Sequence, residues 1–265
     1  MKTIAVVSPV GGAGRTTLTV ALAGLLMARK HAALAVECDP RNVFTFYCGL
    51  RTPARRGLVS HVVSPTDDWS DAALETDDGV LWLPWGGARG DGRGPDAETA
   101  AAIAAVLHEQ PTWLRDLLAR IDLPGHGVAL VDTPAWPSVH ASQAIAAADL
   151  VLVVLPPQPL ACATLPRLRS ELKALGKETV YVANAASPAS QLHTDILTLL
   201  RDALGAELSV YRVHADTGIP EALARNENFV QAAPHSQAAH DLQGLASWLS
   251  NWIHAAHQPA AGAKA

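Results

Sequence analysis

Short apolar runs alternate with longer segments of helical periodicity along the chain. Runs that are short and almost wholly apolar are typical of parallel strands buried on both faces. Their alternation with helices predicts right-handed crossover connections. The expected strands span residues 4–8, 33–38, 80–85, 128–132, 150–155, 180–184 and 208–213, and the expected helices span about 16–29, 97–121, 139–147, 161–175, 191–204 and 236–256. The pattern therefore predicts an α/β fold with a doubly wound, mostly parallel sheet and helices on both faces.

Length and composition are compatible with one domain of this kind. The chain has 265 residues, of which 49% are hydrophobic and 17% are charged. That is enough apolar material for a large core. We expect residues 1–256 to form a single domain and residues 257–265, which lack any pattern, to form a disordered tail. The glycine-rich residues 86–95 are expected to form a flexible surface loop.

Charge and cysteine usage narrow the functional classes. A formal net charge of −5 argues against a protein whose main task is to wrap nucleic acid. Neither a secretory leader nor an apolar run of the ~20 residues needed to span a bilayer occurs, which predicts a cytoplasmic protein. Cys38, Cys48 and Cys162 lack metal-ligand spacing and are expected to be ordinary thiols in a reducing compartment.

A glycine-rich segment links the first expected strand to the first expected helix. It reads Ser8-Pro9-Val10-Gly11-Gly12-Ala13-Gly14-Arg15-Thr16-Thr17. Its glycines allow positive φ angles and let the backbone approach a ligand closely. Backbone N–H groups and the positive end of the helix dipole favour phosphate binding at such a turn. A tight turn without a ligand is the simpler alternative.

Two acidic motifs argue against the simple turn. Asp39 follows the second expected strand in the segment Glu37-Cys38-Asp39-Pro40-Arg41-Asn42, at the sheet edge where α/β folds bind ligands. There Asp39 could orient an attacking water, and Glu37 could contact the shell of a metal ion. Asp132 ends the strand 128–132 and would hold Mg²⁺ together with the Thr16 hydroxyl. The order and spacing of these motifs predict a nucleotide site with Asp39 as its catalytic residue.

Together these motifs resemble the deviant-P-loop ATPases of the MinD/ParA class. The pattern of that class is K-G-G-x-G-K-[ST], then D-x-D-P-Q or similar, then a strand ending in D-[TS]-P, and the likeness extends over nearly the whole chain. It implies a P-loop NTPase fold that binds ATP and Mg²⁺. It implies that Asn184 reads the adenine edge and that residues 213–229 lie around the base. The phosphates would be bound by Gly11, Gly12, Ala13, Gly14, Arg15, Thr16 and Thr17.

Within this class the chain is most similar to the BcsQ family of bacterial cellulose synthesis. That family also lacks the usual lysines and keeps the pattern Gly-Gly-x-Gly-x-Thr-Thr. Residues 67–72 (DDWSDA), 81–86 (LWLPWG) and 245–249 (LASWL) resemble further segments of it. The resemblance implies an ATP-sandwich homodimer that acts in assembly or localisation of a cellulose synthase complex at the inner membrane's cytoplasmic face. A small BcsR-like partner is implied, with membrane contact made through partners and no role for nucleic acid.

The loop departs from the class at two lysine positions. Val10 occupies the position of the lysine that reaches across the dimer, and Arg15 replaces the lysine that holds the phosphates in cis. Arginine keeps the charge but presents a planar fork. One transition-state cation can contribute ~10³–10⁵ in the rate of phosphoryl transfer. We therefore expect tight ATP binding with slow or absent hydrolysis.

Two other readings of the same class remain open. A ParA-type DNA-partition ATPase would need a basic face, for which the cluster Arg51, Arg55 and Arg56 is the candidate. A MinD-type membrane switch would use an amphipathic C-terminal helix, but residues 236–256 carry no lysine or arginine on the polar face. Packing of that helix on the sheet is therefore favoured.

Overall fold

Seven strands form one sheet in the computed structural model, which describes residues 1–63, 72–76, 78–88, 94–124 and 127–257. The strand order is β3-β4-β2-β5-β1-β6-β7, and the pairings are parallel except for antiparallel β3–β4. This arrangement confirms the predicted doubly wound, mostly parallel sheet. The strands are β1 (Lys2–Val7), β2 (Ala33–Glu37), β3 (Leu74–Glu75), β4 (Leu81–Leu83), β5 (Val128–Asp132), β6 (Leu150–Leu155) and β7 (Glu178–Ala183).

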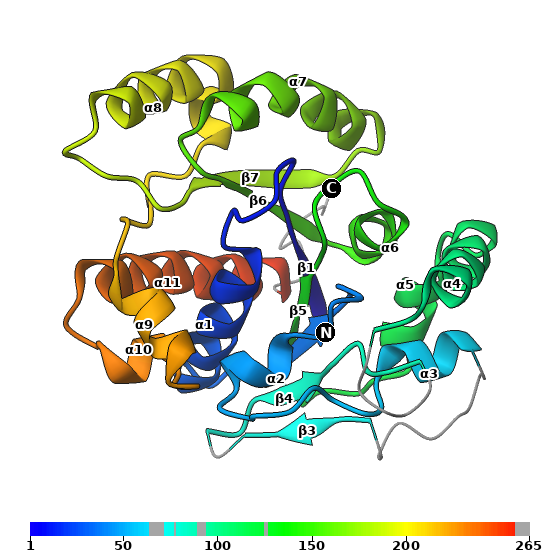
Figure 1. The fold of residues 1–265 in the computed structure, drawn as a ribbon. Helices are drawn as coiled ribbons and strands as arrows, with labels where there is room; N and C mark the ends of the chain where they lie inside the picture. The colour runs from blue at the N-terminus through cyan, green and yellow to red at the C-terminus, as the bar shows by residue number, and fades with distance from the viewer. Residues whose placement is uncertain (64–71, 77, 89–93, 125–126, 258–265) are drawn as a thin grey trace, which may run out of the picture.

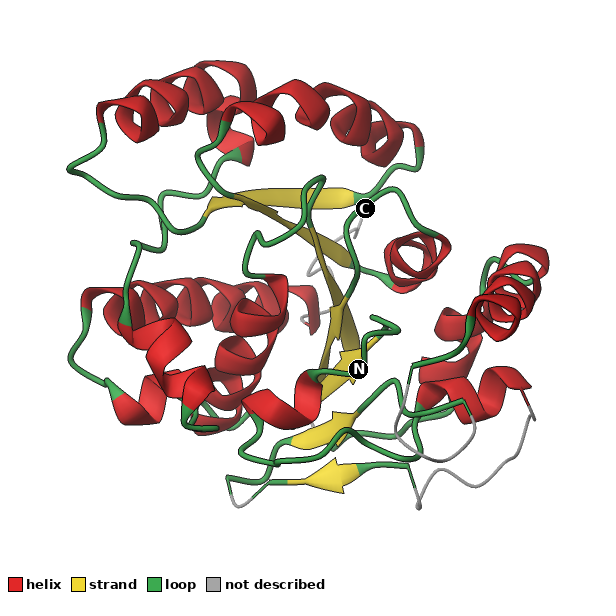
Figure 2. Cartoon of the chain, viewed as in Figure 1, coloured by secondary structure: helices red, strands yellow, loops and turns green. Residues whose placement is uncertain are grey.

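Helices cover both faces of the sheet (Figures 1 and 2). One face carries α1 (Arg15–Ala28) and α11 (Gln237–His257), with the short helices α2 (Phe44–Tyr47), α9 (Gly218–Ala224) and α10 (Phe229–Ala232) beside them. The other helices belong to the opposite layer. They are α3 (Leu58–Val63), α4 (Ala97–Glu109), α5 (Trp113–Leu118), α6 (Val139–Ala147), α7 (Pro159–Ala174) and α8 (Gln191–Leu204).

The strands divide their side chains between two hydrophobic cores, because successive residues of a strand point to opposite faces. In β1, Ile4 and Val6 belong to the core shared with α1 and α11. Ala5 and Val7 belong to the core shared with the opposite helical layer. All four are fully buried. The apolar runs seen in the sequence therefore have the physical cause expected for them, burial on both faces.

Two predicted elements differ from the structure. Residues 208–213 form no strand. They meet β7 at an isolated bridge between Leu208 and Tyr181, with backbone hydrogen bonds from Ser209 N to Tyr181 O (2.8 Å) and from Val213 N to Ala183 O (2.9 Å). The Ser209 hydroxyl accepts a hydrogen bond from the backbone amide of Tyr211 (3.0 Å). Such a local bond competes with the hydrogen bonds between strands. The expected helix 97–121 is split after Glu109, because Pro111 cannot continue a helix.

The C-terminal helix α11 packs on the sheet, as expected. Leu242, Leu245, Leu249 and Ile253 are fully buried in the core shared with α1. Arg29, just after α1, donates to the Gln243 carbonyl and the Ser247 hydroxyl, both at 3.0 Å. Among the helices of the described ranges, none is long and apolar enough to cross a membrane.

Some expectations concern residues that the structure does not describe, and some short elements were not expected at all. Residues 258–265 of the expected tail, residues 89–93 of the expected loop and residues 67–71 of one motif lie outside the described residues. Two expectations are wrong at their edges: His257 of the expected tail is the last residue of α11, and Gly86 and Gly87 of the expected surface loop are buried, with the Gly86 amide donating to Oδ1 of Asn42 at 3.0 Å. The short elements β3, α2, α3, α9 and α10 were missed by the sequence analysis. Segments of two to seven residues are too short to show a period.

Candidate functional site

The glycine-rich loop joins β1 to α1 at the carboxyl edge of the sheet. Gly12 and Gly14 have φ angles of +68° and +90°, which side chains rarely tolerate. A Cβ on Gly14 would lie 2.2 Å from Nδ2 of Asn184, so only glycine fits there. The Asn184 amide donates to the Ala13 carbonyl at 2.7 Å. Asn184, expected to read a base, thus also fixes the shape of the loop.

The N-terminus of α1 is left open for an anion. Gly14 is the N-cap, no side chain caps the helix, and its first turn holds no acidic residue. The first amides of a helix lack intrahelical acceptors, and the helix dipole adds partial positive charge there. This open end is the phosphate-binding arrangement that the sequence predicts for residues 11–17.

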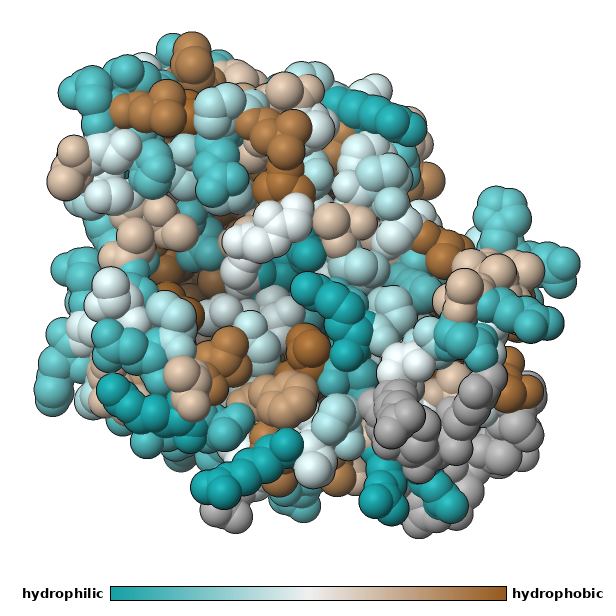
Figure 3. Space-filling view, in the orientation of Figure 1, coloured by the Kyte–Doolittle hydropathy of each residue, from teal (hydrophilic) through white to brown (hydrophobic). Residues whose placement is uncertain are grey.

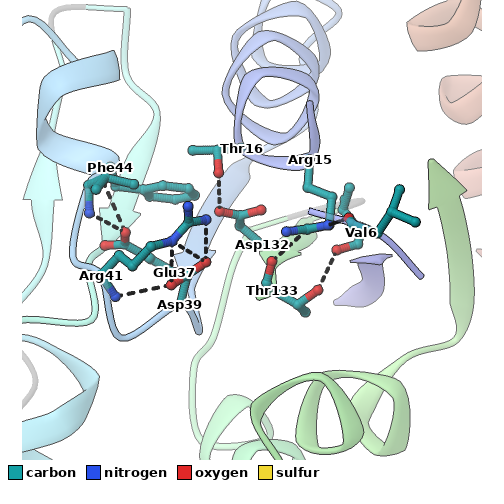
Figure 4. A network of polar contacts seen from close by, with 11 residues as sticks. Val6, Arg15, Thr16, Glu37, Asp39, Arg41, Phe44, Asp132 and Thr133 are labelled. Atoms are coloured by element: carbon teal, nitrogen blue, oxygen red, sulfur yellow. Dashed lines mark hydrogen bonds and ion pairs between the residues drawn. The ribbon is translucent and has the colours of Figure 1, made fainter. Parts of the chain in front are cut away.

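Thr16 and Asp132 meet beneath the loop (Figure 4). The Thr16 hydroxyl donates to Oδ2 of Asp132 at 2.7 Å. Burial raises the pKa of Asp132 to about 7, against the opposing effect of the Thr16 hydrogen bond. Its other oxygen, Oδ1, is buried and has no hydrogen-bond partner among the described residues. A free carboxylate oxygen beside a hydroxyl is a donor set that suits Mg²⁺.

Arg15 is buried and its guanidinium is occupied by backbone groups. Nε donates to the Thr133 carbonyl at 2.8 Å, and an outer nitrogen donates to the Val10 carbonyl at 2.6 Å. The residue is 5% exposed. Burial lowers its pKa, while Asp132 and Asp39 act in the opposite direction. The arginine thus ties the loop to the segment after β5, a role that the sequence did not reveal.

Asp39 carries an arginine partner that the sequence analysis missed. Asp39 is 1% exposed and accepts bonds from Nε of Arg41 (3.0 Å to either oxygen), an outer guanidinium nitrogen (2.6 Å) and the Arg41 amide (3.0 Å). This forked ion pair is the strong, charge-assisted kind. The Arg41 side chain is 62% exposed. The signal was present in the sequence, since Arg41 stands where the class pattern has glutamine.

Glu37 has a structural role in place of the metal contact considered for it. Its two oxygens accept the backbone amides of Val43 (2.6 Å), Phe44 (3.1 Å) and Trp85 (3.1 Å). Burial raises its pKa to about 8, and these amide bonds act in the opposite direction. Glu37 therefore holds together the loops that follow β2 and β4, and so positions Asp39.

A sequence comparison decides the family. The profile of the family described as "Cellulose biosynthesis protein BcsQ" matches residues 1–249 of the chain. This chain belongs to the BcsQ family. The recognition from the loop and its two acidic motifs is thereby confirmed.

Other known proteins are similar to this chain in sequence or in fold. The virulence plasmid ParA family protein pGP5-D of Chlamydia psittaci is 21% identical over 256 residues, which is 95% of each chain. The structure of the septum site-determining protein MinD from Pyrococcus horikoshii with Mg-ADP has a TM-score of 0.77 at 19% identity, over 97% of this chain and 99% of that one. A Cyanothece McdA variant with ATP has a TM-score of 0.77 at 16% identity, over 94% and 96%. The BcsQ-family chain therefore has the P-loop fold of MinD/ParA-type ATPases.

Other candidate residues are placed away from the loop or serve the fold. His214 is held by Asp241 of α11, through Nδ1 (2.6 Å) and its backbone amide (2.9 Å). This pair anchors the segment that was expected near a base. Arg51, Arg55 and Arg56 are exposed. Cys38, Cys48 and Cys162 are free thiols, and burial raises the pKa of each.

Proposed function

We propose that this BcsQ-family chain binds ATP with Mg²⁺ and forms a nucleotide-stabilised homodimer that acts as an assembly or localisation factor of a bacterial cellulose synthase complex. One observation carries the proposal. The open N-terminus of α1 stands directly over the Thr16–Asp132 pair, whose buried Oδ1 lacks a partner in the described part of the chain. Amides for phosphate and oxygens for a cation thus lie side by side.

Each residue of the site has a distinct task in this proposal. The amides of residues 11–17 bind phosphate oxygens, and Gly14 keeps that surface open. Thr16 and Asp132 hold Mg²⁺, which when bound neutralises charge on the phosphates. Asn184 supports the loop through Ala13 and borders the place expected for the base.

Three features favour binding over turnover. Val10 is 6% exposed and packs in a hydrophobic core, so it brings no charge to a partner subunit. The donors of Arg15 are engaged with two backbone carbonyls. Asp39, the candidate for orienting water, is neutralised by Arg41. Hydrolysis depends on positioned charge at the γ-phosphate, and each feature removes or diverts one such charge.

We further propose that the protein is cytoplasmic and is recruited to the inner membrane by partner proteins, including a small BcsR-like protein. The apolar face of α11 is buried against the sheet and α1. That helix therefore offers no apolar face of its own to a lipid surface, which supports attachment through partners.

Light scattering on the purified protein tests the proposal. With ATP and Mg²⁺ we expect a dimer that persists for many minutes with little phosphate release, and a monomer with ADP or without nucleotide. Asp132→Ala should remain monomeric with ATP, whereas Asp202→Asn, an exposed change on α8, should dimerise normally. A monomer indifferent to ATP would contradict the proposal.

A DNA-partition role is the second candidate, because the relative from Chlamydia psittaci is named a ParA family protein and because Arg51 and Arg55 are exposed. Salt-sensitive binding of duplex DNA in the presence of ATP, lost on replacing both arginines by alanine, would favour it.

A further inference from the structure

A cavity, which we call the edge cavity, lies at the β3 end of the sheet. Its volume is about 850 Å³. It is lined by α2 and the turn that follows, by the β3–β4 hairpin, and by residues between α9 and α10. None of residues 11–17, Asp39, Asp132 or Asn184 lines it. A ligand of the edge cavity is therefore distinct from a phosphate bound at the loop.

The floor of the edge cavity is aromatic. Phe44 and Trp82 meet edge to face with ring centroids 5.5 Å apart, and Tyr47 joins them in the lining. The Trp82 indole donates to the Thr76 hydroxyl at 3.0 Å, which fixes the ring. Leu50 and Leu74 add exposed apolar surface at the rim, 44% and 39% exposed. Figure 3 shows hydrophobic surface over the region of α2, bordered by hydrophilic side chains toward β3.

The charged side chains that line the edge cavity are acidic. They are Glu75, Asp78 and Glu227, and no lysine or arginine lines it within the described ranges. Glu227 lies 4.0 Å from Arg225, but Glu75 and Asp78 make no ion pair with a described residue. The carboxylates of Glu75 and Asp78, which no described cation neutralises, give the rim of the cavity a negative potential.

The edge cavity also borders an unsatisfied hydroxyl. Thr45 is among the lining residues and is 2% exposed. Its Oγ1 is buried and has no hydrogen-bond partner in the part of the chain that the structure describes. Buried polar groups are normally paired, so this hydroxyl is a feature that a bound polar group would satisfy.

We propose that the edge cavity binds an extended basic segment of a partner protein, in which arginine or lysine alternates with apolar residues. A guanidinium can stack on an aromatic ring and pair with a carboxylate at the same time. β3 is the last strand of the sheet, and its outer edge has no partner strand among the described residues. An extended segment can pair there, and its alternate side chains then divide between the aromatic floor and the acidic rim.

One side chain connects the edge cavity to the phosphate loop. Tyr47 lines the cavity, and the nearby Thr17 lies in the first turn of α1. Tyr47 and Thr17 also line a narrow crevice together with Glu227 and Asn228. Occupation of the cavity should therefore alter nucleotide affinity, a consequence that rests on the proposed ATP binding. Peptide binding itself does not rest on it and is tested without nucleotide.

Fluorescence anisotropy with a labelled octapeptide of alternating arginine and leucine tests the site. We expect saturable binding that weakens with added salt, and at least tenfold weaker binding of the matched peptide with glutamate in place of arginine. Equal binding of the two peptides would overturn the proposal, because the acidic rim would then have no effect.

Variants locate the binding. The double change Glu75→Gln with Asp78→Asn should weaken the arginine peptide roughly tenfold, since it removes two exposed ion pairs. Ala232→Trp should block it by filling the cavity from its exposed wall. Asp202→Asn on α8 removes one charge far from the cavity and should leave binding unchanged. Unaltered binding by both cavity variants, or equal competition by the small cation spermine, would overturn the proposal.

Discussion

The residues around the phosphate loop, which we call the loop site, and the edge cavity differ in how their polar groups are satisfied. In the loop site nearly every charged group has a partner: Arg15 donates to two carbonyls, Glu37 accepts from three amides and Asp39 accepts from the fork of Arg41. The edge cavity has carboxylates at an open rim and an aromatic floor. In the first region Oδ1 of Asp132 has no partner among the described residues, whereas in the second Glu75 and Asp78 have no counter-charge among them. The unpaired groups fit the proposed metal-bound phosphate in one case and the proposed basic segment in the other.

The largest expected effect tests how closely the phosphate loop is packed against Asn184. Gly14→Ala should lower the free energy of unfolding by about 3–5 kcal/mol, because it adds left-handed strain to a clash with Asn184. Gly176→Ala is the matched control, with φ at +63° and open space around the added carbon, and should cost only about 1–2 kcal/mol. Urea unfolding compares the two. Equal losses would show that the loop is not packed against Asn184.

The next effect concerns His140 of α6, which packs on Trp85 with ring centroids 4.8 Å apart. Burial lowers the pKa of His140 to about 4, with a smaller opposing effect of Asp39. A lowered pKa stabilises the fold above the unfolded value near 6.5, and that stability is lost as pH falls toward 4. The loss should reach about 3 kcal/mol.

Urea unfolding of wild type and His140→Leu at pH 7 and pH 4.5 isolates this contribution, because the variant cannot be protonated at that position. Asp132 and Glu37 have raised pKa values and act in the opposite direction over the same pH range in both proteins. On acidification the free energy of unfolding of the wild type should therefore fall by about 2–3 kcal/mol relative to that of the variant. An equal change in the two proteins would show that His140 is not the group responsible.

Removing the Asp132 carboxylate, whose Oδ1 has no partner among the described residues, should abolish the metal-dependent part of nucleotide affinity. Asp132→Ala should weaken ATP binding roughly 100-fold in Mg²⁺, equivalent to about 2.7 kcal/mol. In EDTA the variant and wild type should bind ATP alike. Calorimetry in both buffers checks this, and a deficit that persists in EDTA would point to a damaged loop.

Freeing Asp39 should raise turnover. Arg41→Gln removes the forked ion pair, and we expect phosphate release to increase roughly tenfold because the carboxylate becomes available to water. Asp39→Asn in the same background should cancel the gain. An unchanged or slower rate in Arg41→Gln would show that the ion pair does not restrain hydrolysis.

The smallest effect links the two regions. Tyr47→Phe removes the phenolic hydroxyl at the narrow crevice shared with Thr17 but keeps the aromatic floor. It should change the affinity for ATP or for the arginine peptide alone less than about fivefold, within ~1 kcal/mol for one polar group. The influence of bound peptide on ATP affinity should disappear. Coupling that survives in the variant would place the connection elsewhere.

The fold and the composition of the site were largely predictable, and the connections within the site were not. The apolar runs located six of the seven strands because burial on both faces leaves a strong local pattern. The loop, Asp39 and Asp132 were found because each stands at the carboxyl end of an apolar run that predicts a strand. The predicted strand 208–213 failed because local serine bonding and a single neighbour decided its conformation. The pairing of Arg41 with Asp39 depends on side-chain direction, which motif spacing does not contain.

The sequence by itself determined that a glycine-rich turn precedes a helix and that Asp39 and Asp132 stand at the carboxyl ends of strands, because these are properties of local pattern and chain order. The tertiary structure decided where each charge is used. Packing directs the Arg15 guanidinium to the carbonyls of Thr133 and Val10 rather than to solvent. It also brought residues from three distant segments together as the edge cavity. Such contacts join positions far apart in the chain, so only the folded arrangement of helices and strands defines them.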